Sequence, residues 1–114
     1  MYAVIRRFMT IGDMDEALRR GDAWYTKAVK DQVGFVAHQI VRTGPGEAIS
    51  VLFFDNQEEA DRNRSFSEEF IAVGFADLDV ELVDEWRGEV QVSAASDLAL
   101  ERVHADQRAR SNIA

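Results

Sequence analysis

Apolar and polar residues alternate along the chain with two different periods, and the changes between them predict four strands and two helices. Two stretches carry apolar residues every three or four positions, as amphipathic helices do, over residues 13–32 and 56–74. Four shorter stretches are rich in β-branched and aromatic residues, which is typical of strands. We expect these strands at residues 2–9, 35–42, 47–54 and 78–86. The order of elements is therefore βαββαβ.

Turn and capping signals agree with that order. Asp13, and Asp55 or Asn56, are each followed three residues later by a glutamate, which is the spacing of an N-terminal helix cap. The segment 43–46, Thr-Gly-Pro-Gly, contains the only proline and predicts a hairpin between the second and third strands. With right-handed crossovers, we expect an α+β, ferredoxin-like domain. Its four-stranded antiparallel sheet has the order 4-1-3-2, with both helices on one face.

The third expected strand is apolar on both of its faces. Val51 and Phe53 point one way, and Leu52 and Phe54 point the other way. Two helices cover only one face of a sheet, so the second face needs a different cover. A second copy of the chain is the commonest partner. The pattern therefore predicts a homodimer in which two sheets face each other.

The composition changes after the fourth expected strand. We expect the folded domain to span residues 1–92 and a polar tail to span 93–114. Ser96 can cap a short helix that continues to Arg108, with a few apolar contacts along it. The sequence thus predicts one domain with an appendage.

Charge and composition exclude several classes of partner. The net charge is −8, and the basic residues form no stripe of the kind that binds phosphates, so we expect no nucleic-acid partner. No run approaches the roughly 18 apolar residues of a membrane helix, and the first residues do not form a signal peptide, so we expect no membrane partner. The absence of cysteine fits a reducing compartment, and we expect a cytoplasmic protein.

Two polar residues stand out as candidates for chemistry. His38 lies within an expected strand, where it is either a general base or hydrogen-bond donor to a ligand, or an edge-strand residue bonded to a neighbour. Asn63 projects from the helix stripe that faces the sheet, where it either holds a ligand or caps a backbone group. The histidines are too few and too far apart for a metal site, and we expect neither a metal nor a cofactor.

Charged and aromatic residues extend this candidate set. Arg6 and Arg7 point to opposite faces of a central strand, so one of them must be buried and needs an anion. Asp84 or Glu85 on the neighbouring strand is the expected partner, and a bound anionic ligand is the alternative. The aromatic residues either belong to the core or line a ligand pocket: Trp24, Tyr25, Phe66, Phe70 and Trp86.

Three segments resemble the antibiotic-biosynthesis-monooxygenase-like domains of the dimeric α+β barrel superfamily. They are the opening YAVIRRF at residues 2–8, the VGF step at 33–35, and the stretch SVLFFDNQEEADR at 50–62. The resemblance covers about residues 2–90 and implies a pocket between helices and sheet. That family includes cofactor-independent oxygenases of aromatic polyketides and haem-degrading enzymes. The haem-degrading branch uses a histidine on the second helix, and residues 57–74 contain none, so we expect no haem.

Two functional hypotheses follow from the residues and the resemblance. The first is a cofactor-independent oxygenase of a small, partly apolar or aromatic molecule, with His38 as base or polariser, Asn63 as orienting amide, and Arg6 or Arg7 as anion partner. The second is a non-catalytic, dimeric protein that binds a small ligand.

Strand alternation makes a separate prediction about His38. Counting along the second strand places His38 on one face with Val36 and Ile40. The opposite face is the more apolar, and we expect it to meet the helices through Phe35, Ala37 and Val41. His38 is then expected to point away from the helices, into the barrel between two subunits.

Overall fold

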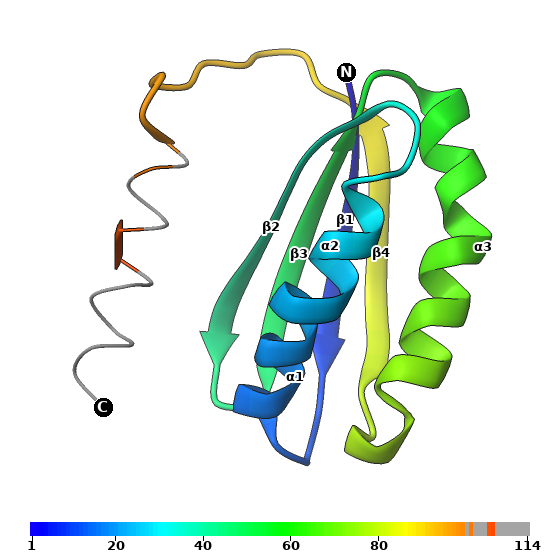
Figure 1. Ribbon diagram of the computed structural model, residues 1–114, viewed down its shortest axis with the longest axis vertical. Helices are drawn as coiled ribbons and strands as arrows, with labels where there is room; N and C mark the ends of the chain where they lie inside the picture. Colours follow the sequence, from blue (N-terminus) through cyan, green and yellow to red (C-terminus); the bar gives the residue numbers. More distant parts are fainter. Residues whose placement is uncertain (100, 102–104, 107–114) are drawn as a thin grey trace.

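The computed structural model describes residues 1–99, 101 and 105–106, and it shows a sheet covered on one side by helices (Figure 1). The element order is βαββαβ, as the sequence predicts. The strands are β1 (Tyr2–Met9), β2 (Phe35–Gly44), β3 (Glu47–Phe54) and β4 (Glu81–Glu89). The helical segments are α1 (Met14–Arg20), the π-helical turn η1 (Gly21–Thr26), α2 (Lys27–Val29), α3 (Gln57–Gly74) and the 3₁₀ turn η2 (Ala76–Leu78).

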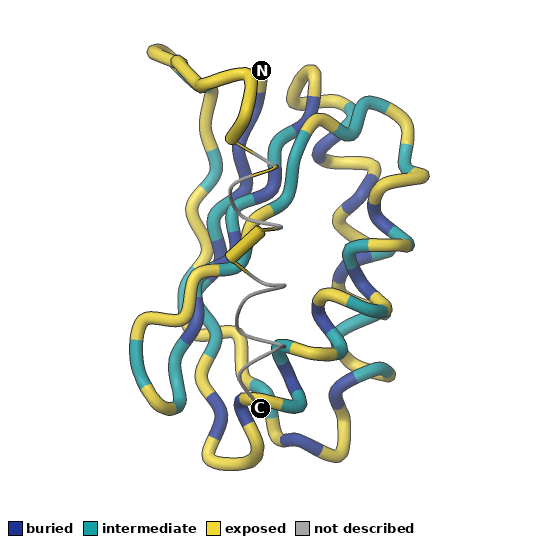
Figure 2. Tube along the Cα trace, turned by 60° about the vertical axis from the view of Figure 1, so that its left-hand side comes forward, coloured by how far each residue is buried: buried dark blue, intermediate teal, exposed yellow. Residues whose placement is uncertain are grey.

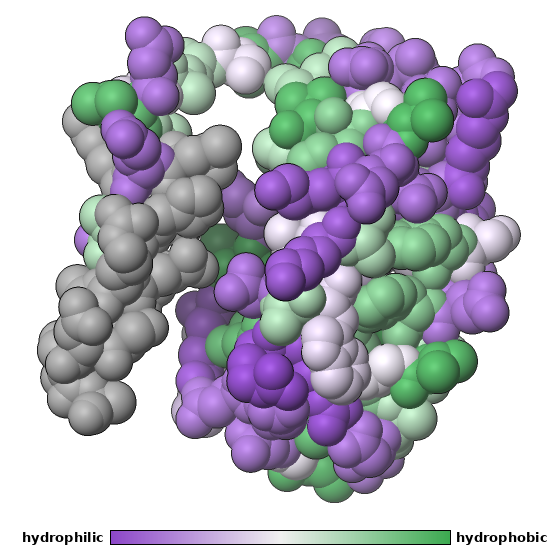
Figure 3. All heavy atoms as spheres, in the orientation of Figure 1, coloured by the Kyte–Doolittle hydropathy of each residue, from purple (hydrophilic) through white to green (hydrophobic). Residues whose placement is uncertain are grey.

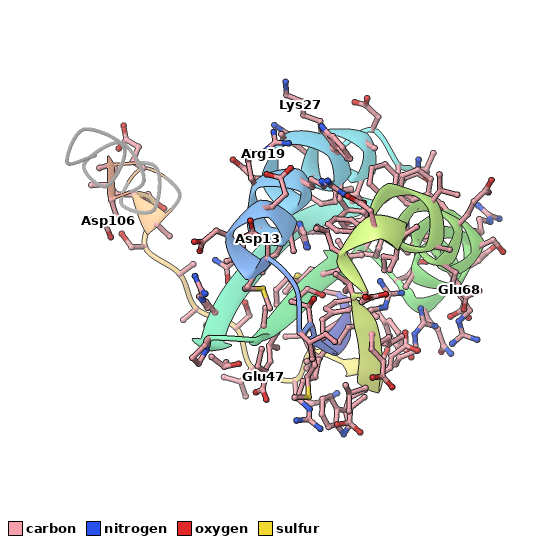
Figure 4. All side chains as sticks on the ribbon, turned by 90° about the horizontal axis from the view of Figure 1, so that it is seen from below. Asp13, Arg19, Lys27, Glu47, Glu68 and Asp106 are labelled. Atoms are coloured by element: carbon pink, nitrogen blue, oxygen red, sulfur yellow. The ribbon has the colours of Figure 1, made fainter. Side chains whose placement is uncertain are left out.

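The sheet has the order β2-β3-β1-β4, and every neighbouring pair is antiparallel. This is the expected order 4-1-3-2. Figure 4, seen from below and so down the strands, shows the helices of the domain on one side of the sheet. The fold is therefore ferredoxin-like, with β1 and β3 as the central strands.

Side-chain caps fix the starts of both helical layers. The Asp13 carboxylate accepts a hydrogen bond from the Glu16 backbone N–H, and the Asn56 side-chain oxygen accepts one from the Glu59 backbone N–H. These bonds satisfy amide groups that have no partner inside the helix. The expected caps are confirmed, with Asn56 chosen over Asp55.

The fourth strand begins three residues later than expected. Ala76–Leu78 form the 3₁₀ turn η2, and Asp79 then adopts a left-handed backbone with φ 51°. This turn takes up residues whose composition resembles a strand, so β4 starts at Glu81. The expected helix over 96–108 falls largely outside the described residues, and the boundary between 92 and 93 stays a prediction.

Two apolar clusters fill the space between the helices and the sheet, as the buried segments in Figure 2 show. The first consists of Tyr2, Val4, Tyr25, Val29, Leu52, Phe54 and Ala60. The second consists of Met14, Ala17, Ala48, Phe75 and Leu78. On the outer side of the helices polar residues predominate, and apolar residues show mainly between α2 and α3 (Figure 3).

The opposite face of the sheet carries apolar side chains without a helix over them. On β3, Ile49, Val51 and Phe53 are only half-buried, whereas the residues between them are buried against the helices. On the outer strands, Val41 and Trp86 are 52% and 51% exposed. The two-sided apolarity that the sequence shows for β3 is thus present in the fold. We call this helix-free surface the open face.

Candidate functional site

A cavity of about 70 Å³ lies between the helices and the sheet. One water needs roughly 10–15 Å³ of such space, so the cavity has room for several waters or a small organic group. It is lined by Arg6, Phe8, Met14, Ala17, Leu18, Gly21, Tyr25, His38, Ile40, Ala48, Ser50, Ile71, Phe75 and Val80. Its wall is largely apolar, with a few polar groups that can orient a ligand.

Arg6 is the buried cation of this cavity. Arg6 is 4% exposed, and its Nε donates a hydrogen bond to Glu85 Oε1 at 3.2 Å. The sheet register causes this contact, because Arg6 lies directly opposite Glu85 in the β1–β4 pair. Arg87 Nε lies 3.5 Å from the same carboxylate oxygen. The carboxylate partner expected for a buried arginine is therefore present.

Arg7 lies on the open face, away from the cavity. It donates hydrogen bonds to Asp84 and to Glu47, and it lies directly opposite Asp84 in the sheet. The two arginines thus divide between the two sides of the sheet, as strand alternation predicts. Only Arg6 contributes to the cavity.

His38 faces the helices, so the sequence prediction that it points into the barrel is wrong. The reason is a β-bulge at the start of β2. Phe35 lies opposite Phe54 and Ala37 lies opposite Phe53, so Val36 is an extra residue without a partner. The bulge shifts the alternation by one residue. Phe35 still packs against the core as expected, and His38 also turns toward the helices. Ala37 and Val41, also expected to meet the helices, lie opposite open-face residues of β3, so that part of the prediction is wrong.

The environment of His38 keeps its imidazole neutral. Burial and the positive charge of Arg6 lower the pKa of His38 from its ordinary value to about 4. The Nδ1 atom lies 3.1 Å from Thr26 Oγ1, and the ring packs edge-on against Tyr25 with centroids 5.1 Å apart. At neutral pH the site therefore pairs a neutral imidazole with a guanidinium cation.

This lowered pKa makes a prediction about stability. Between about pH 6.5 and about pH 4, the unfolded chain binds a proton at His38 that the folded chain does not bind. The free energy of unfolding is therefore highest above this pH window, and it falls as the pH falls through the window, because protonation at His38 favours the unfolded chain. We expect wild type to lose about 2 to 3 kcal/mol more than His38→Gln between about pH 7.5 and about pH 4.5.

Urea unfolding of both proteins at the two pH values, at one protein concentration, measures this difference. Glu16 stays outside the window, because Arg19 and Arg20 hold the pKa of its carboxyl at about 2. Equal losses in wild type and in the variant would show that His38 is not held neutral by the fold.

Asn63 belongs to a buried hydrogen-bond chain that reaches the cavity through Tyr25. Ser67 Oγ donates to Asn63 Oδ1 at 2.7 Å, and the same hydroxyl lies 2.7 Å from the Tyr25 hydroxyl. Asn63 is 3% exposed and Ser67 is fully buried. The Asn63 Nδ2 group is buried, and it has no hydrogen-bond partner among the residues that the structure describes. Such a group costs stability unless an acceptor reaches it.

The five candidate aromatic residues separate into two groups. Tyr25, Phe66 and Phe70 pack together, with ring centroids 5.4 to 6.2 Å apart, in and around the first apolar cluster. Trp24 is 43% exposed and lies under the guanidinium groups of Arg19 and Arg20 rather than in the cavity. Trp86 lies on the open face. Of the five, only Tyr25 lines the cavity.

Solved structures share this architecture. A protein from Deinococcus radiodurans assigned to the antibiotic biosynthesis monooxygenases superposes with a TM-score of 0.67 at 13% identity, over 84% of this chain and 98% of that chain. A variant of SnoaB, a cofactor-independent oxygenase from Streptomyces nogalater, gives a TM-score of 0.65 at 15% identity, over 83% and 97%. The fold is that of the antibiotic biosynthesis monooxygenases. The resemblance expected from the sequence is confirmed at the level of fold.

A dimeric ferredoxin-like protein from an uncultured marine organism also superposes on this monooxygenase-like fold. Its TM-score is 0.66 at 11% identity, over 83% of this chain and 98% of that chain. No protein-family model matches the sequence, and no curated protein matches it. At such identities the likeness establishes the fold, and the activity must be argued from the site.

Within this monooxygenase-like fold, the described residues form no group of three or more histidine, aspartate or glutamate side chains that could hold a metal ion. Helix α3 contains no histidine. No helix in the described part of the chain is long and apolar enough to cross a membrane.

Sequence reasoning missed three polar residues of the site. Ser50 is buried and lines the cavity, Ser67 links Asn63 to Tyr25, and Thr26 contacts His38. One signal was available for two of them, because Ser50 alternates with apolar residues on β3 and Ser67 falls on the inner stripe of α3. Thr26 carries no such signal, since its position depends on the irregular turn η1.

Proposed function

We propose that the protein is a cofactor-independent oxygenase acting on a small, partly apolar or aromatic molecule that contains an activated methylene group. One observation carries this proposal. A neutral imidazole and a guanidinium lie together in the wall of an apolar cavity, in a fold that it shares with a cofactor-independent oxygenase. The proposal needs no metal and no cofactor.

The chemistry of such a site follows from charge. A methylene beside a carbonyl loses its proton to His38, and Arg6 stabilises the enolate oxygen that forms. The enolate then supplies the electrons that reduce O₂, so the substrate replaces a redox centre. The methylene carbon becomes a ketone and water leaves, so that CH₂ and O₂ give C=O and H₂O. No external reductant is required by this balance.

The low pKa of His38 limits the substrates that it can deprotonate. A base works best when its pKa lies near the operating pH, and a pKa of about 4 makes His38 a weak base. The substrate must therefore be acidic for a carbon acid, and Arg6 lowers the pKa of the substrate further by pairing with its anion. We assign Asn63 to the orientation of a ligand through Ser67 and Tyr25.

Benzoylacetone tests the activity, because its methylene lies between two carbonyl groups and it carries one aromatic ring. We expect one O₂ consumed per molecule oxidised, and a rate lowered about 10²- to 10⁴-fold in His38→Gln. The 2,2-dimethyl derivative has no proton on the reacting carbon and serves as the matched control. Oxygen uptake is followed with an electrode, and the product by mass spectrometry.

The alternative function is a dimeric protein that binds a small ligand without turnover. The weak basicity of His38 and the largely apolar wall favour it. Saturable binding of benzoylacetone with no oxygen uptake above the protein-free rate would contradict the oxygenase proposal and support this alternative. Equal uptake by wild type and His38→Gln would contradict the role of His38 as the base.

The second part of our proposal is that two chains pair through their open faces. The half-buried residues of β3 and the exposed Val41 and Trp86 support this arrangement, because apolar side chains on one contiguous surface mark an interaction site. The likeness to a dimeric ferredoxin-like protein agrees with it. A homodimer leaves the cavity of each chain on the outer, helix-covered side.

A further inference from the structure

The π-helical turn η1 interrupts the first helical layer beside the cavity. Its residues are Gly21–Thr26, and its last side chain reaches back, so that Thr26 Oγ1 donates a hydrogen bond to the Gly21 carbonyl at 2.9 Å. The two residues are five positions apart, which is the spacing of a π-helix rather than of an α-helix. The hydroxyl proton of Thr26 is therefore used in a hydrogen bond within the turn.

The same hydroxyl oxygen lies 3.1 Å from Nδ1 of His38. A hydroxyl has one proton and two lone pairs. Because the proton of Thr26 is directed at a carbonyl, which only accepts, the oxygen has lone pairs left for the imidazole. Nδ1 must then carry the proton and donate it to Thr26.

A neutral imidazole carries one ring proton, so the other nitrogen is an acceptor. Nε2 makes no hydrogen bond within the described part of the chain. It is not one of the fully buried side-chain atoms without a partner, so it remains accessible from the cavity. Arg6, Tyr25 and Ser50 are the other polar groups that line the cavity with His38. Arg6 has only hydrogen-bond donors, so it cannot accept a hydrogen bond from a ligand.

We infer that Thr26 is a positioning residue that fixes the tautomer of His38 with its proton on Nδ1, and that Nε2 is therefore a hydrogen-bond acceptor in the cavity wall. The hydroxyl group of a ligand can bind both side chains through one oxygen, because it donates its proton to His38 Nε2 and accepts a hydrogen bond from Arg6. The favoured ligand class is thus phenols and enols. This inference rests on the proposed use of the cavity as a ligand site.

The tautomer is measured without any ligand. Long-range ¹H–¹⁵N NMR spectra of the uniformly labelled protein at neutral pH distinguish a protonated ring nitrogen from an unprotonated one, and His38→Gln identifies the His38 signals. We expect an unprotonated Nε2 in wild type and in Thr26→Ser, which keeps the hydroxyl. In Thr26→Val, which has the same shape without a hydroxyl, we expect a shift toward the form protonated on Nε2.

A wild-type spectrum with the proton on Nε2 would overturn the inference, whether or not the valine variant folds. An unchanged tautomer in folded Thr26→Val would also overturn it, because Thr26 would then have no positioning role. Neither outcome depends on oxygenase activity, so this test and the oxygen-uptake test fail independently.

Binding of phenol and anisole tests the acceptor role of Nε2. The two probes have similar shapes, but only phenol donates a hydrogen bond. We expect wild type to bind phenol about fivefold to tenfold more tightly than anisole, as one neutral hydrogen bond allows, and Thr26→Val to lose most of that preference. Equal affinities of wild type for the two probes, followed by NMR titration, would rule out Nε2 as the acceptor for a ligand.

Discussion

Val51→Lys is expected to convert the protein into a monomer. Val51 lies on central strand β3, half-buried on the open face, and pairs with Ile5 and Gln39 of the neighbouring strands. In a dimer of facing sheets, its side chain is removed from water, and a lysine there would bury a charge without a partner. Such a charge costs several kcal/mol, so we expect the dimer affinity to fall about 100-fold or more.

Sedimentation equilibrium at micromolar concentration measures this change, with Val73→Lys as the matched control. Val73 is 76% exposed on α3, on the helix side, so the same substitution there should leave the dimer intact. A wild type that sediments as a monomer, or a Val51→Lys variant that remains dimeric, would show that the open face is not the interface between chains.

Arg6→Met is expected to weaken phenol binding about tenfold to 100-fold. The guanidinium makes a charge-assisted hydrogen bond to the ligand oxygen, and such bonds contribute roughly 1.5–3 kcal/mol. Methionine fills a similar volume in the apolar wall but offers neither charge nor donor. NMR titration with phenol measures the loss, and Arg62→Met on the exposed surface of α3 is the control.

The same substitution should change stability by less than about 1 kcal/mol, although Arg6 is buried. Breaking a buried ion pair is costly when the remaining charge has no partner. Here Glu85 Oε1 still lies 3.5 Å from Arg87 Nε, so its charge remains paired after Arg6 is replaced. The variant should also raise the pKa of His38, because the positive charge of Arg6 is one cause of its depression. A large loss of stability together with unchanged phenol binding would make Arg6 a structural residue.

The sequence predicts the frame of the site better than its details. The order of the sheet follows from the hairpin at 43–46 and the handedness of crossovers. That order places the strand with Asp84 and Glu85 beside the strand with Arg6, and the register then selects Glu85 as the partner of Arg6. These features depend on patterns that extend over many residues. A local error in one strand does not change them.

The details depend on single residues that break a period. Val36 looks like any strand residue, yet as the unpaired residue of a bulge it reverses the side to which His38 turns. The π-helical turn is similarly hidden. Buried residues recur there at positions 17, 21, 25 and 29, four apart, which is wider than the α-helical period of about 3.6. A regular helix instead predicts Ala28, which is only partly buried, in place of Val29.

The bulge at Val36 also changes how this chain should be aligned with its relatives. A relative with a regular second strand reaches the same point on the sheet with one residue fewer. Its counterpart of His38 then lies two positions after the residue that matches Phe35, not three. An alignment without a gap at this position pairs His38 with a residue on the opposite side of the sheet. Comparisons of this site across the fold must therefore allow a one-residue gap at the entrance to β2.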